Sequence, residues 1–313
     1  MSEAQIISVV SPVYGCRDCL AELAKRVRAA FEGTAFDWEL ILVDDRGPDH
    51  PWPLIQELAA EDGRIRGVRL SRNHGQHLAI WAGLEAARGD WVAIVDCDLQ
   101  DDPNVIPALH AQAVTEGVDQ VIVDRGEWTD TGLRRMASRA FVRLIDFLAG
   151  IRLDNGGIFG IYSRRTVDIL LMYREQEVFL PIMAAMTGLP RASYRLDRSD
   201  RAAGQSSYTF LRLIRMAVSI VIRISDRPLK LSVAVGLAFS GLSAFVSVIV
   251  LLAWMTGAFT VPGWTSLILS VWFLAGLILA VLGIHGFYMG RIFAEVQGRP
   301  RIIVEQTTEQ SEP

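Results

Sequence analysis

Residues 91–103 read WVAIVDCDLQDDP, an apolar strand that runs straight into a cluster of acidic residues. Asp96 and Asp98 stand one residue apart where this strand is expected to end, so their carboxylates can share one hard divalent cation. Such a cation can hold a diphosphate, and α/β sheets bind their ligands at the carboxyl ends of parallel strands. The stretch therefore predicts a parallel sheet with a metal and diphosphate site at one edge.

Apolar strand-like runs alternate with helical periods along the first half of the chain. The expected strands are 6–11, 38–44, 65–70, 91–96 and 120–124, and the expected helices are 19–31, 53–60, 77–87, one after Pro103, and 133–149. Such β-α alternation predicts an α/β fold with a mostly parallel sheet covered by helices on both faces.

Residues 231–290 contain no Asp, Glu, Lys or Arg. A turn-like interruption at 256–263 divides this stretch into 231–255 and 264–290, and each part exceeds the roughly 20 apolar residues that cross a bilayer. Two buried core helices are the alternative, but soluble helices seldom stay uncharged for so long. We therefore expect a hairpin of two transmembrane helices.

Basic residues flank the two expected spans, whereas the loop between them is uncharged. Both ends of the hairpin should therefore face the cytosol under the positive-inside rule. The flanking residues are Arg223, Arg227 and Lys230 before the first span, and Arg291, Arg299 and Arg301 after the second.

The expected domains are a cytosolic domain 1–208, an amphipathic segment 209–230, the spans, and a cytosolic tail 291–313. The amphipathic segment either lies at the membrane interface or packs on the soluble domain, and residues 305–313 read as disordered.

Charge and cysteine content exclude some classes of protein. A net charge of −4 argues against a general nucleic-acid binder. Cys16, Cys19 and Cys97 are too few for a disulfide framework, and the N-terminus lacks the pattern of a signal peptide. Cys16 and Cys19 fit C-x-x-C, which is found in redox and zinc sites, but no second pair accompanies them. We interpret them as ordinary thiols, and Cys97 as a buried spacer turned away from Asp96 and Asp98.

Other polar residues follow the expected strands, and each allows two interpretations. Asp44 and Asp45 either accept hydrogen bonds from a nucleobase or ribose or form a solvated turn. The segment 72–77, RNHGQH, can line a nucleotide cleft because Gly75 permits close backbone approach. Its two histidines are better explained as polar surface residues than as metal ligands. Asp101 and Asp102 can cap the helix that follows Pro103.

Candidate phosphate-binding cations lie later in the chain. Arg134 and Ser138 are one helical turn apart, so they either hold one phosphate together or belong to a solvated helix face. Arg125 precedes them. Arg201 begins a polar, glycine-containing loop up to Tyr208, directly before the membrane segments, where cations would meet a lipid phosphate.

Taken together, these motifs resemble the polyprenyl-phosphate glycosyltransferases, which are inverting enzymes of glycosyltransferase family 2. The similarity covers ISVVSPVYG, LILVDD, SRNHGQHLAIWAG, ARGDWVAIVDCDLQDDP, RMASR, GIYSRRTVDIL, RAAGQSSYTFLRLI and GFYMGRIFAEVQGRP. It implies a Rossmann-like, nucleotide-sugar-binding domain of the GT-A type. It also implies transfer of a sugar, from a UDP-linked donor, to undecaprenyl phosphate with inversion, which serves glycan or lipid modification of the bacterial cell envelope.

The resemblance also implies roles for individual residues and partners. Asp96 and Asp98 would bind a divalent cation, Mg²⁺ or Mn²⁺. The protein would be a homo-oligomer at the bacterial inner membrane. The donor site would comprise Pro12, Tyr14, Asp44, Asp45, Arg72, Asn73, Gly75, Asp96, Gln100, Arg201 and Ser206. The acceptor phosphate would meet Arg125, Arg134 and Ser138, which with Asp96, Asp98 and Arg201 form the catalytic set.

The chain departs from the family pattern at several positions of the expected site. Relatives usually carry Asn-Glu at Gly15-Cys16, Gly at Arg46 and Lys at Ser207. Some relatives carry Asp at Ile158. These departures leave open a non-catalytic, nucleotide-binding membrane scaffold. A processive polysaccharide synthase is a second alternative, although its Gln-x-x-Arg-Trp motif is not found here.

Overall fold

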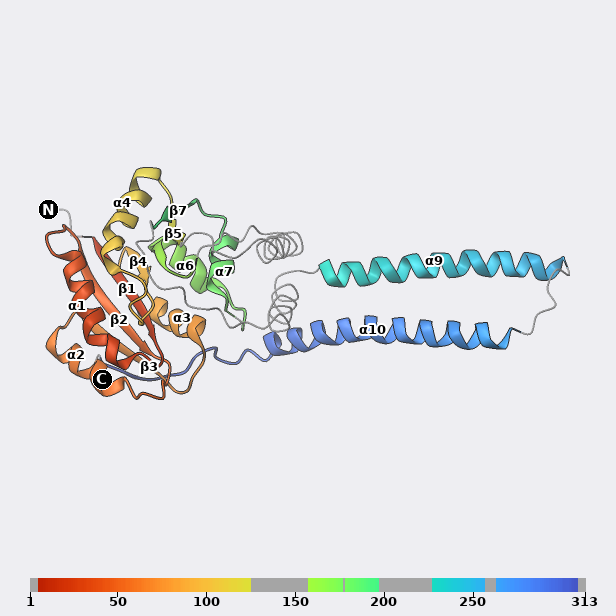
Figure 1. Cartoon of the computed structure of the whole chain (residues 1–313), viewed down its shortest axis with the longest axis horizontal. Coiled ribbons are helices and arrows are strands. Elements are labelled where there is room, and N and C mark those ends of the chain that lie inside the picture. Colours follow the sequence, from red (N-terminus) through yellow and green to blue (C-terminus); the bar gives the residue numbers. More distant parts are fainter. Residues whose placement is uncertain (1–4, 125–156, 177, 197–226, 257–262, 309–313) are drawn as a thin grey trace, which may run out of the picture. The chain divides into compact units, whose positions relative to one another are not determined.

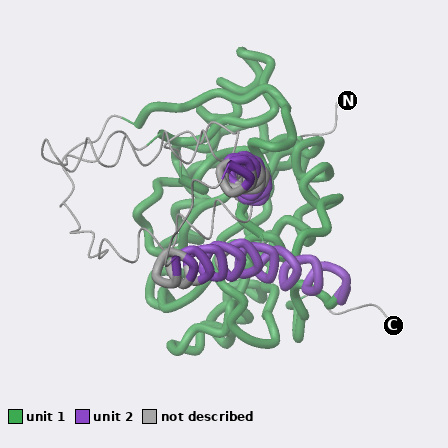
Figure 2. The backbone as a smooth tube through the Cα atoms, turned by 90° about the vertical axis from the view of Figure 1, so that its right-hand side faces the viewer, with its two compact units in different colours: residues 1–131, 151–203, 299–313 green, residues 132–150, 204–298 purple. Residues whose placement is uncertain are grey.

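The structure is a computed structural model that describes residues 5–124, 157–176, 178–196, 227–256 and 263–308. The chain divides into two compact units, coloured separately in Figure 2. The first comprises Met1–Thr131, Ile151–Ala203 and Arg299–Pro313, and the second comprises Gly132–Gly150 and Gly204–Gly298. The expected helix 133–149 and segment 209–226 lie outside the described residues.

The first unit contains a sheet whose strands have the order β7-β5-β6-β4-β1-β2-β3-β8. Figure 1 labels β1 to β5 and β7 of this sheet. The strands are β1 Ile6–Val13, β2 Asp37–Asp44, β3 Ile65–Leu70, β4 Trp91–Ile94, β5 Gln120–Asp124, β6 Gly160–Ser163, β7 Arg191–Arg195 and β8 Val304–Thr307. The four strands β3, β2, β1 and β4 are mutually parallel, as expected.

The sheet as a whole is mixed, because two of its strands, β6 and β8, run against the others. β6 runs antiparallel to β4 and β5, and β8 runs antiparallel to β3, whereas β5 and β7 are parallel. The antiparallel strands are short and were not indicated by the β-α alternation. The expectation of a mostly parallel sheet is therefore correct for β1 to β5 and β7, which run in one direction, and wrong for β6 inside the sheet and for β8 at one edge.

Helices cover both faces of the sheet, which confirms that part of the expectation. The helices are α1 Leu20–Phe31, α2 Trp52–Glu61, α3 Gln76–Ala86, α4 Ile106–Glu116, α6 Arg164–Met172 and α7 Leu180–Met186, with short 3-10 helices η1 Arg17–Cys19 and η2 Pro103–Val105. Successive residues of β1 point to opposite faces, so Val9 and Val10 belong to two separate buried clusters. The first cluster packs beneath α1, α2 and α4, and the second beneath α3, α6 and α7.

The second unit contains two long helices, α9 Arg227–Met255 and α10 Trp264–Val296, which contact one another. α9 matches the first expected span, and α10 continues six residues past the expected end of the second at Gly290. Among the described residues, one segment of 24 residues, Phe273–Val296 of α10, is long and apolar enough to cross a membrane by length and composition.

The end of the chain returns to the first unit. We expected residues 305–313 to be disordered, and this is wrong for residues 305–307, which lie in β8; Gln306 and Thr307 pair with β3, and Glu305 lies at an irregularity in the pairing. The neighbouring Thr308 and Gly67 exchange two further hydrogen bonds, of 2.8 and 3.0 Å. Paired backbone groups at the edge of the sheet account for this order, although the side chains of β8 are polar and exposed.

Candidate active site

A cavity of 540 Å³ opens where the parallel strands β1 to β4 end. Its volume lies within the range of small-molecule binding sites. Each of the four strands leads into one part of the lining, as the rule for parallel sheets predicts. The lining residues are Pro12, Val13, Tyr14, Gly15 and Cys16, then Asp45, then Asn73, Gly75 and Gln76, and finally Asp96, Cys97 and Asp98.

The two aspartates of the quoted stretch both line this cavity. Asp96 is half-buried and its Oδ1 accepts a 2.6 Å hydrogen bond from Nε2 of Gln76, whereas Asp98 is exposed. Oδ1 of Asp98 accepts the Gln100 N–H at 3.1 Å across a turn in which Leu99 has a φ of 62°. Among the described residues, Asp98 thus keeps an oxygen for another ligand, since this bond occupies only part of its acceptor capacity.

The remaining acidic residues of the stretch have structural roles. Asp102 caps η2, because its Oδ1 accepts the Asn104 N–H at 3.1 Å, which confirms the expected cap. Asp101 is buried, and its Oδ2 lies 3.5 Å from the Asp96 backbone nitrogen. Neither residue lines the cavity.

Asp44 and Asp45 are both buried, so the solvated-turn interpretation is wrong. Asp45 lines the cavity, and its two oxygens accept the N–H groups of His74 and Gly75 at 2.7 and 2.9 Å. Asp44 lies behind the lining, where its carboxylate accepts the Arg46 N–H at 2.9 Å and lies 3.3 Å from Nε of Arg69. Asp45 therefore holds the loop before α3, and Asp44 holds the turn that follows β2.

Burial raises the pKa of both carboxyls above their usual range. A lower pH therefore protonates Asp45 more readily than an ordinary aspartate, and the protonated carboxyl has less capacity to accept the two loop N–H groups. The affinity of the cavity for a nucleotide should thus fall as the pH decreases from neutrality toward this raised pKa.

Asp45→Asn tests this coupling between Asp45 and the loop. The amide has a single oxygen for two N–H groups, so we expect the affinity for a UDP-sugar to fall roughly tenfold, in line with hydrogen bonds to charged acceptors. The variant should also lose the part of the pH dependence that belongs to Asp45, leaving that of Asp44. Calorimetric titration at several pH values measures both effects. Asp37→Asn, at the exposed start of the same strand, is the matched control.

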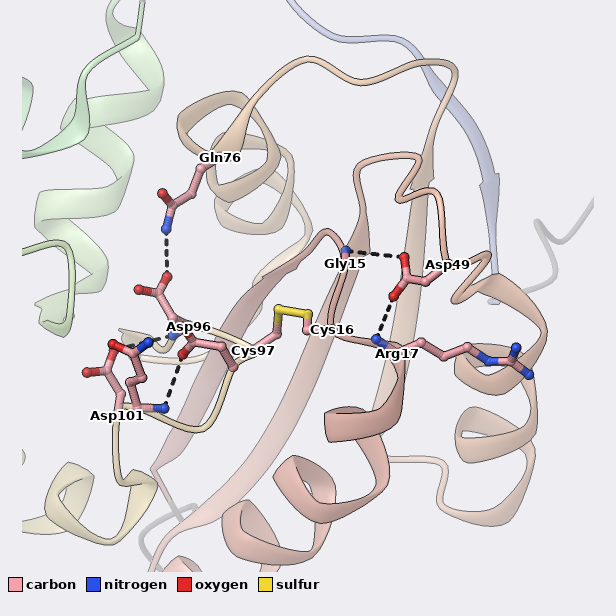
Figure 3. Close-up of a disulfide and its surroundings, with 10 residues drawn as sticks. Gly15, Cys16, Arg17, Asp49, Gln76, Asp96, Cys97 and Asp101 are labelled. Atoms are coloured by element: carbon pink, nitrogen blue, oxygen red, sulfur yellow. Dashed lines mark hydrogen bonds between the residues drawn. A yellow bond between two sulfur atoms is a disulfide. The ribbon is translucent and has the colours of Figure 1, made fainter. Parts of the chain in front are cut away.

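The cysteines differ from the expectation of ordinary thiols. Cys16 and Cys97 form a disulfide between the turn after β1 and the acidic loop after β4, and Figure 3 shows this bond beside Asp96. Cys97 is buried, as expected of a spacer, but it is bonded, while Cys19 keeps a free thiol. The pairing was missed because it depends on the adjacency of β1 and β4 in the sheet rather than on any local spacing.

Two further residues shape the cavity and were not identified as site residues. Gln76, which belongs to the segment 72–77, donates its side-chain hydrogen bond to Asp96. The carboxylate of Asp49 accepts the backbone N–H groups of Gly15 and Arg17 at 3.2 and 2.7 Å, as Figure 3 shows. Asp49 thereby fixes the turn after β1, which forms one wall of the cavity.

Several predicted site residues are not among the lining residues. Arg72 and Gln100 are exposed on neighbouring loops, and Asp44 is buried behind the wall. His74 and His77 are half-buried, and the ring of His77 lies 4.5 Å from that of Phe179. The predicted phosphate ligands Arg125, Arg134, Ser138, Arg201 and Ser206 lie outside the described residues.

The residues of the cavity fit a divalent cation shared with a ligand. Within the described ranges, no group of three or more His, Cys, Asp or Glu side chains is arranged to hold a metal ion. Mg²⁺, however, is usually bound by one or two carboxylates together with substrate phosphates and water. Asp96 and Asp98 supply two such carboxylates on one side of the cavity.

A cavity with an acidic pair, at the carboxyl ends of parallel strands, is the place where α/β proteins typically bind their ligands. Residues 8–169 match the model of the family described as Glycosyl transferase family 2. The chain belongs to this family and is a glycosyltransferase.

Curated relatives match the chain over nearly its full length. The undecaprenyl-phosphate 4-deoxy-4-formamido-L-arabinose transferase of Pseudomonas fluorescens (strain SBW25) is 35% identical over 306 residues, which cover 96% of this chain and 89% of that protein. The enzyme of the same name from Aeromonas hydrophila subsp. hydrophila is 33% identical, with 97% and 94% covered.

Solved structures are more distant. The mannosyl-3-phosphoglycerate synthase of Rubrobacter xylanophilus aligns with a TM-score of 0.47 and 18% identity, and the alignment covers 72% of this chain and 74% of that one. This similarity is too low to bear on the substrate or the mechanism.

Proposed function

We propose that the protein transfers a sugar from a UDP-sugar to undecaprenyl phosphate, with inversion, and so makes a lipid-linked monosaccharide for the bacterial cell envelope. The observation that carries this proposal is the cavity lined by Asp96 and Asp98 in a chain that is similar to undecaprenyl-phosphate sugar transferases over nearly its full length. The same match favours the formamido-arabinose group as the sugar.

The donor would bind in the cavity, with its nucleoside against Pro12, Tyr14, Asp45 and Asn73. The diphosphate would lie toward Asp96 and Asp98. A divalent cation, Mg²⁺ or Mn²⁺, on these carboxylates would neutralise the charge that develops on the leaving diphosphate. The exposure of Asp98 and of the Tyr14 side chain supports this arrangement, since both are accessible from solvent.

The acceptor phosphate is already anionic near neutral pH, so its oxygen can attack the anomeric carbon without a strong general base. The new bond forms between this oxygen and the anomeric carbon, while the bond from that carbon to the diphosphate breaks and UDP leaves. Ile158, which stands where some relatives carry Asp, packs against the second buried cluster and supplies no base. Positioning the two repelling phosphates then falls to cations, for which we propose Arg125, Arg134 and Arg201, helped by the hydroxyl of Ser138.

We also propose that α9 and α10 form a transmembrane hairpin in the inner membrane, with both ends and the catalytic unit in the cytosol, and that the protein is a homo-oligomer. Support for the hairpin comes from the uncharged stretch 231–290 and from the basic residues at both of its ends. A polyprenyl acceptor is confined to the bilayer, so a membrane anchor would keep the enzyme beside its substrate.

The test is an assay of the purified full-length chain with undecaprenyl phosphate, Mg²⁺ or Mn²⁺ and a panel of nucleotide sugars, including the formamido-arabinose donor. Mass spectrometry of the lipid fraction should reveal one sugar added per lipid and an equal amount of UDP released. Tight UDP binding without turnover on any donor would instead favour the nucleotide-binding scaffold. A polymeric product would favour the processive synthase.

A further inference from the structure

The chain segment that follows α10 contacts the donor cavity's supporting loops, a connection that the proposed function does not use. We call residues 299–308 the C-terminal strap. Its strand β8 pairs with β3, and its Ile303 carbonyl accepts the Ser71 N–H at 2.9 Å, at the start of the loop that leads to the cavity. Further along that loop, Asn73 and Gly75 line the cavity.

Glu305 of the strap forms an ion pair with Arg46. Arg46 also donates a 2.9 Å hydrogen bond from Nε to the Leu70 carbonyl. The side chains of Arg46 and Glu305 remain 31% and 39% exposed, so the pair is accessible and is not part of the core. Arg46 is therefore held from two directions, by the end of β3 and by the strap.

Arg46 needs such support because of its backbone. Its φ is 58°, in the left-handed region that glycine adopts freely but that costs other residues conformational energy. The next residue, Gly47, packs so closely that a Cβ there would lie 3.0 Å from the Gly15 backbone nitrogen. The turn at 46–47 thus has an unfavourable conformation that its surroundings must maintain.

Both walls of the donor cavity are attached to this turn. Asp45, directly before it, accepts the N–H groups of His74 and Gly75. Asp49, two residues after Gly47, accepts those of Gly15 and Arg17. A change in the turn would therefore move the two walls relative to each other.

We propose that Glu305 is a positioning residue for donor binding: through Arg46 it fixes the left-handed turn that sets the two walls of the nucleotide cavity. This inference rests on the proposed function, because it takes the cavity as the site of a nucleoside diphosphate. It assigns the C-terminal strap a role in the affinity for the donor and none in the chemical step.

Glu305→Gln tests the inference, since it keeps the shape of the side chain and removes its charge. In the full-length protein in detergent, we expect the Kd for UDP, measured by calorimetry with Mn²⁺, to rise roughly threefold to fivefold, as for partly exposed ion pairs. In the transfer assay the KM for the donor should rise by the same factor while kcat stays unchanged. A merely structural role would instead lower the active fraction.

The second part of the test places Glu305→Gln in a protein that already carries Arg46→Gly. Glycine adopts the left-handed turn without strain, so adding Glu305→Gln to Arg46→Gly should change the Kd no further. An equal loss of affinity in this background would overturn the proposal, and so would an unchanged Kd for Glu305→Gln alone. Val304→Thr is the matched control, because Val304 neighbours Glu305 on the strand and its apolar side chain can form no ion pair with Arg46.

Hydrogen exchange separates this inference from the proposed function. Glu305→Gln should accelerate amide exchange at 45–49 and 73–76, whether or not UDP binds, and unchanged exchange there would contradict the positioning role. If the wild-type protein binds no UDP at all, the proposed function fails, and the exchange rates alone then decide whether the strap holds the turn.

Discussion

Asp98→Asn is expected to lower the rate of sugar transfer by at least about a hundredfold, because the metal that we propose on this carboxylate would supply several kcal/mol of transition-state stabilisation. The fold should survive the change. The Asp98 Oδ1 atom accepts the Gln100 N–H, and the oxygen of asparagine can accept the same bond. The loss therefore falls on the charge and on the second oxygen, which are the properties that a divalent cation requires.

Two measurements separate this effect from general damage. Mn²⁺ binding, followed by electron paramagnetic resonance in the presence of UDP, should weaken in parallel with the rate. Asp102→Asn is the matched control, because it removes a carboxylate from the same loop but keeps the cap of η2. Near-normal transfer by Asp98→Asn at saturating metal would reject the metal assignment.

The sequence predicts the strands that carry the site because apolar residues predominate in them and most are buried. The expected strands 38–44, 65–70 and 120–124 end at the observed ends of β2, β3 and β5, and the acidic residues consequently fall at the predicted edge of the sheet. β7 and β8 escape prediction for the opposite reason. Their sequences RASYR and VEQT are short and polar, and as edge strands they have no need of an apolar pattern.

In the site, too, residues that follow one strand could be predicted from the sequence, whereas contacts between distant segments could not. Asp96 and Asp98 were identified because a strand delivers them together. The partners of Asp45 and Asp49 were not, because these carboxylates accept backbone N–H groups that any residue type could supply. The sequence of the loop that donates the N–H groups therefore does not indicate these bonds. Likewise, Cys16 and Cys97 are 81 residues apart, and only the adjacency of β1 and β4 brings them together.

Removal of the Cys16–Cys97 disulfide is expected to lower the free energy of unfolding of the first unit by about 4 kcal/mol, the value for a cross-link that closes a loop of this length. Cys97→Ser and chemical reduction of the wild-type protein should give the same destabilised state. Denaturant titration, monitored by the fluorescence of the buried Trp38, Trp52 and Trp81, measures the change. Cys19→Ser is the control and should leave the oxidised protein unchanged, because Cys19 is unbonded.

The same bond has a consequence for the metal site, because Cys97 lies between Asp96 and Asp98. The disulfide anchors the acidic loop to the turn after β1, whose other support is Asp49. Loss of the bond leaves both carboxylates in place but frees their loop, so Cys97→Ser should weaken Mn²⁺ binding by a smaller factor than Asp98→Asn. Since cytosolic thiols are normally kept reduced, the state of this bond in cells would set how firmly the acidic pair is held. Alkylation of free thiols in intact cells, followed by mass spectrometry of the peptides containing Cys16 and Cys97, measures that state directly.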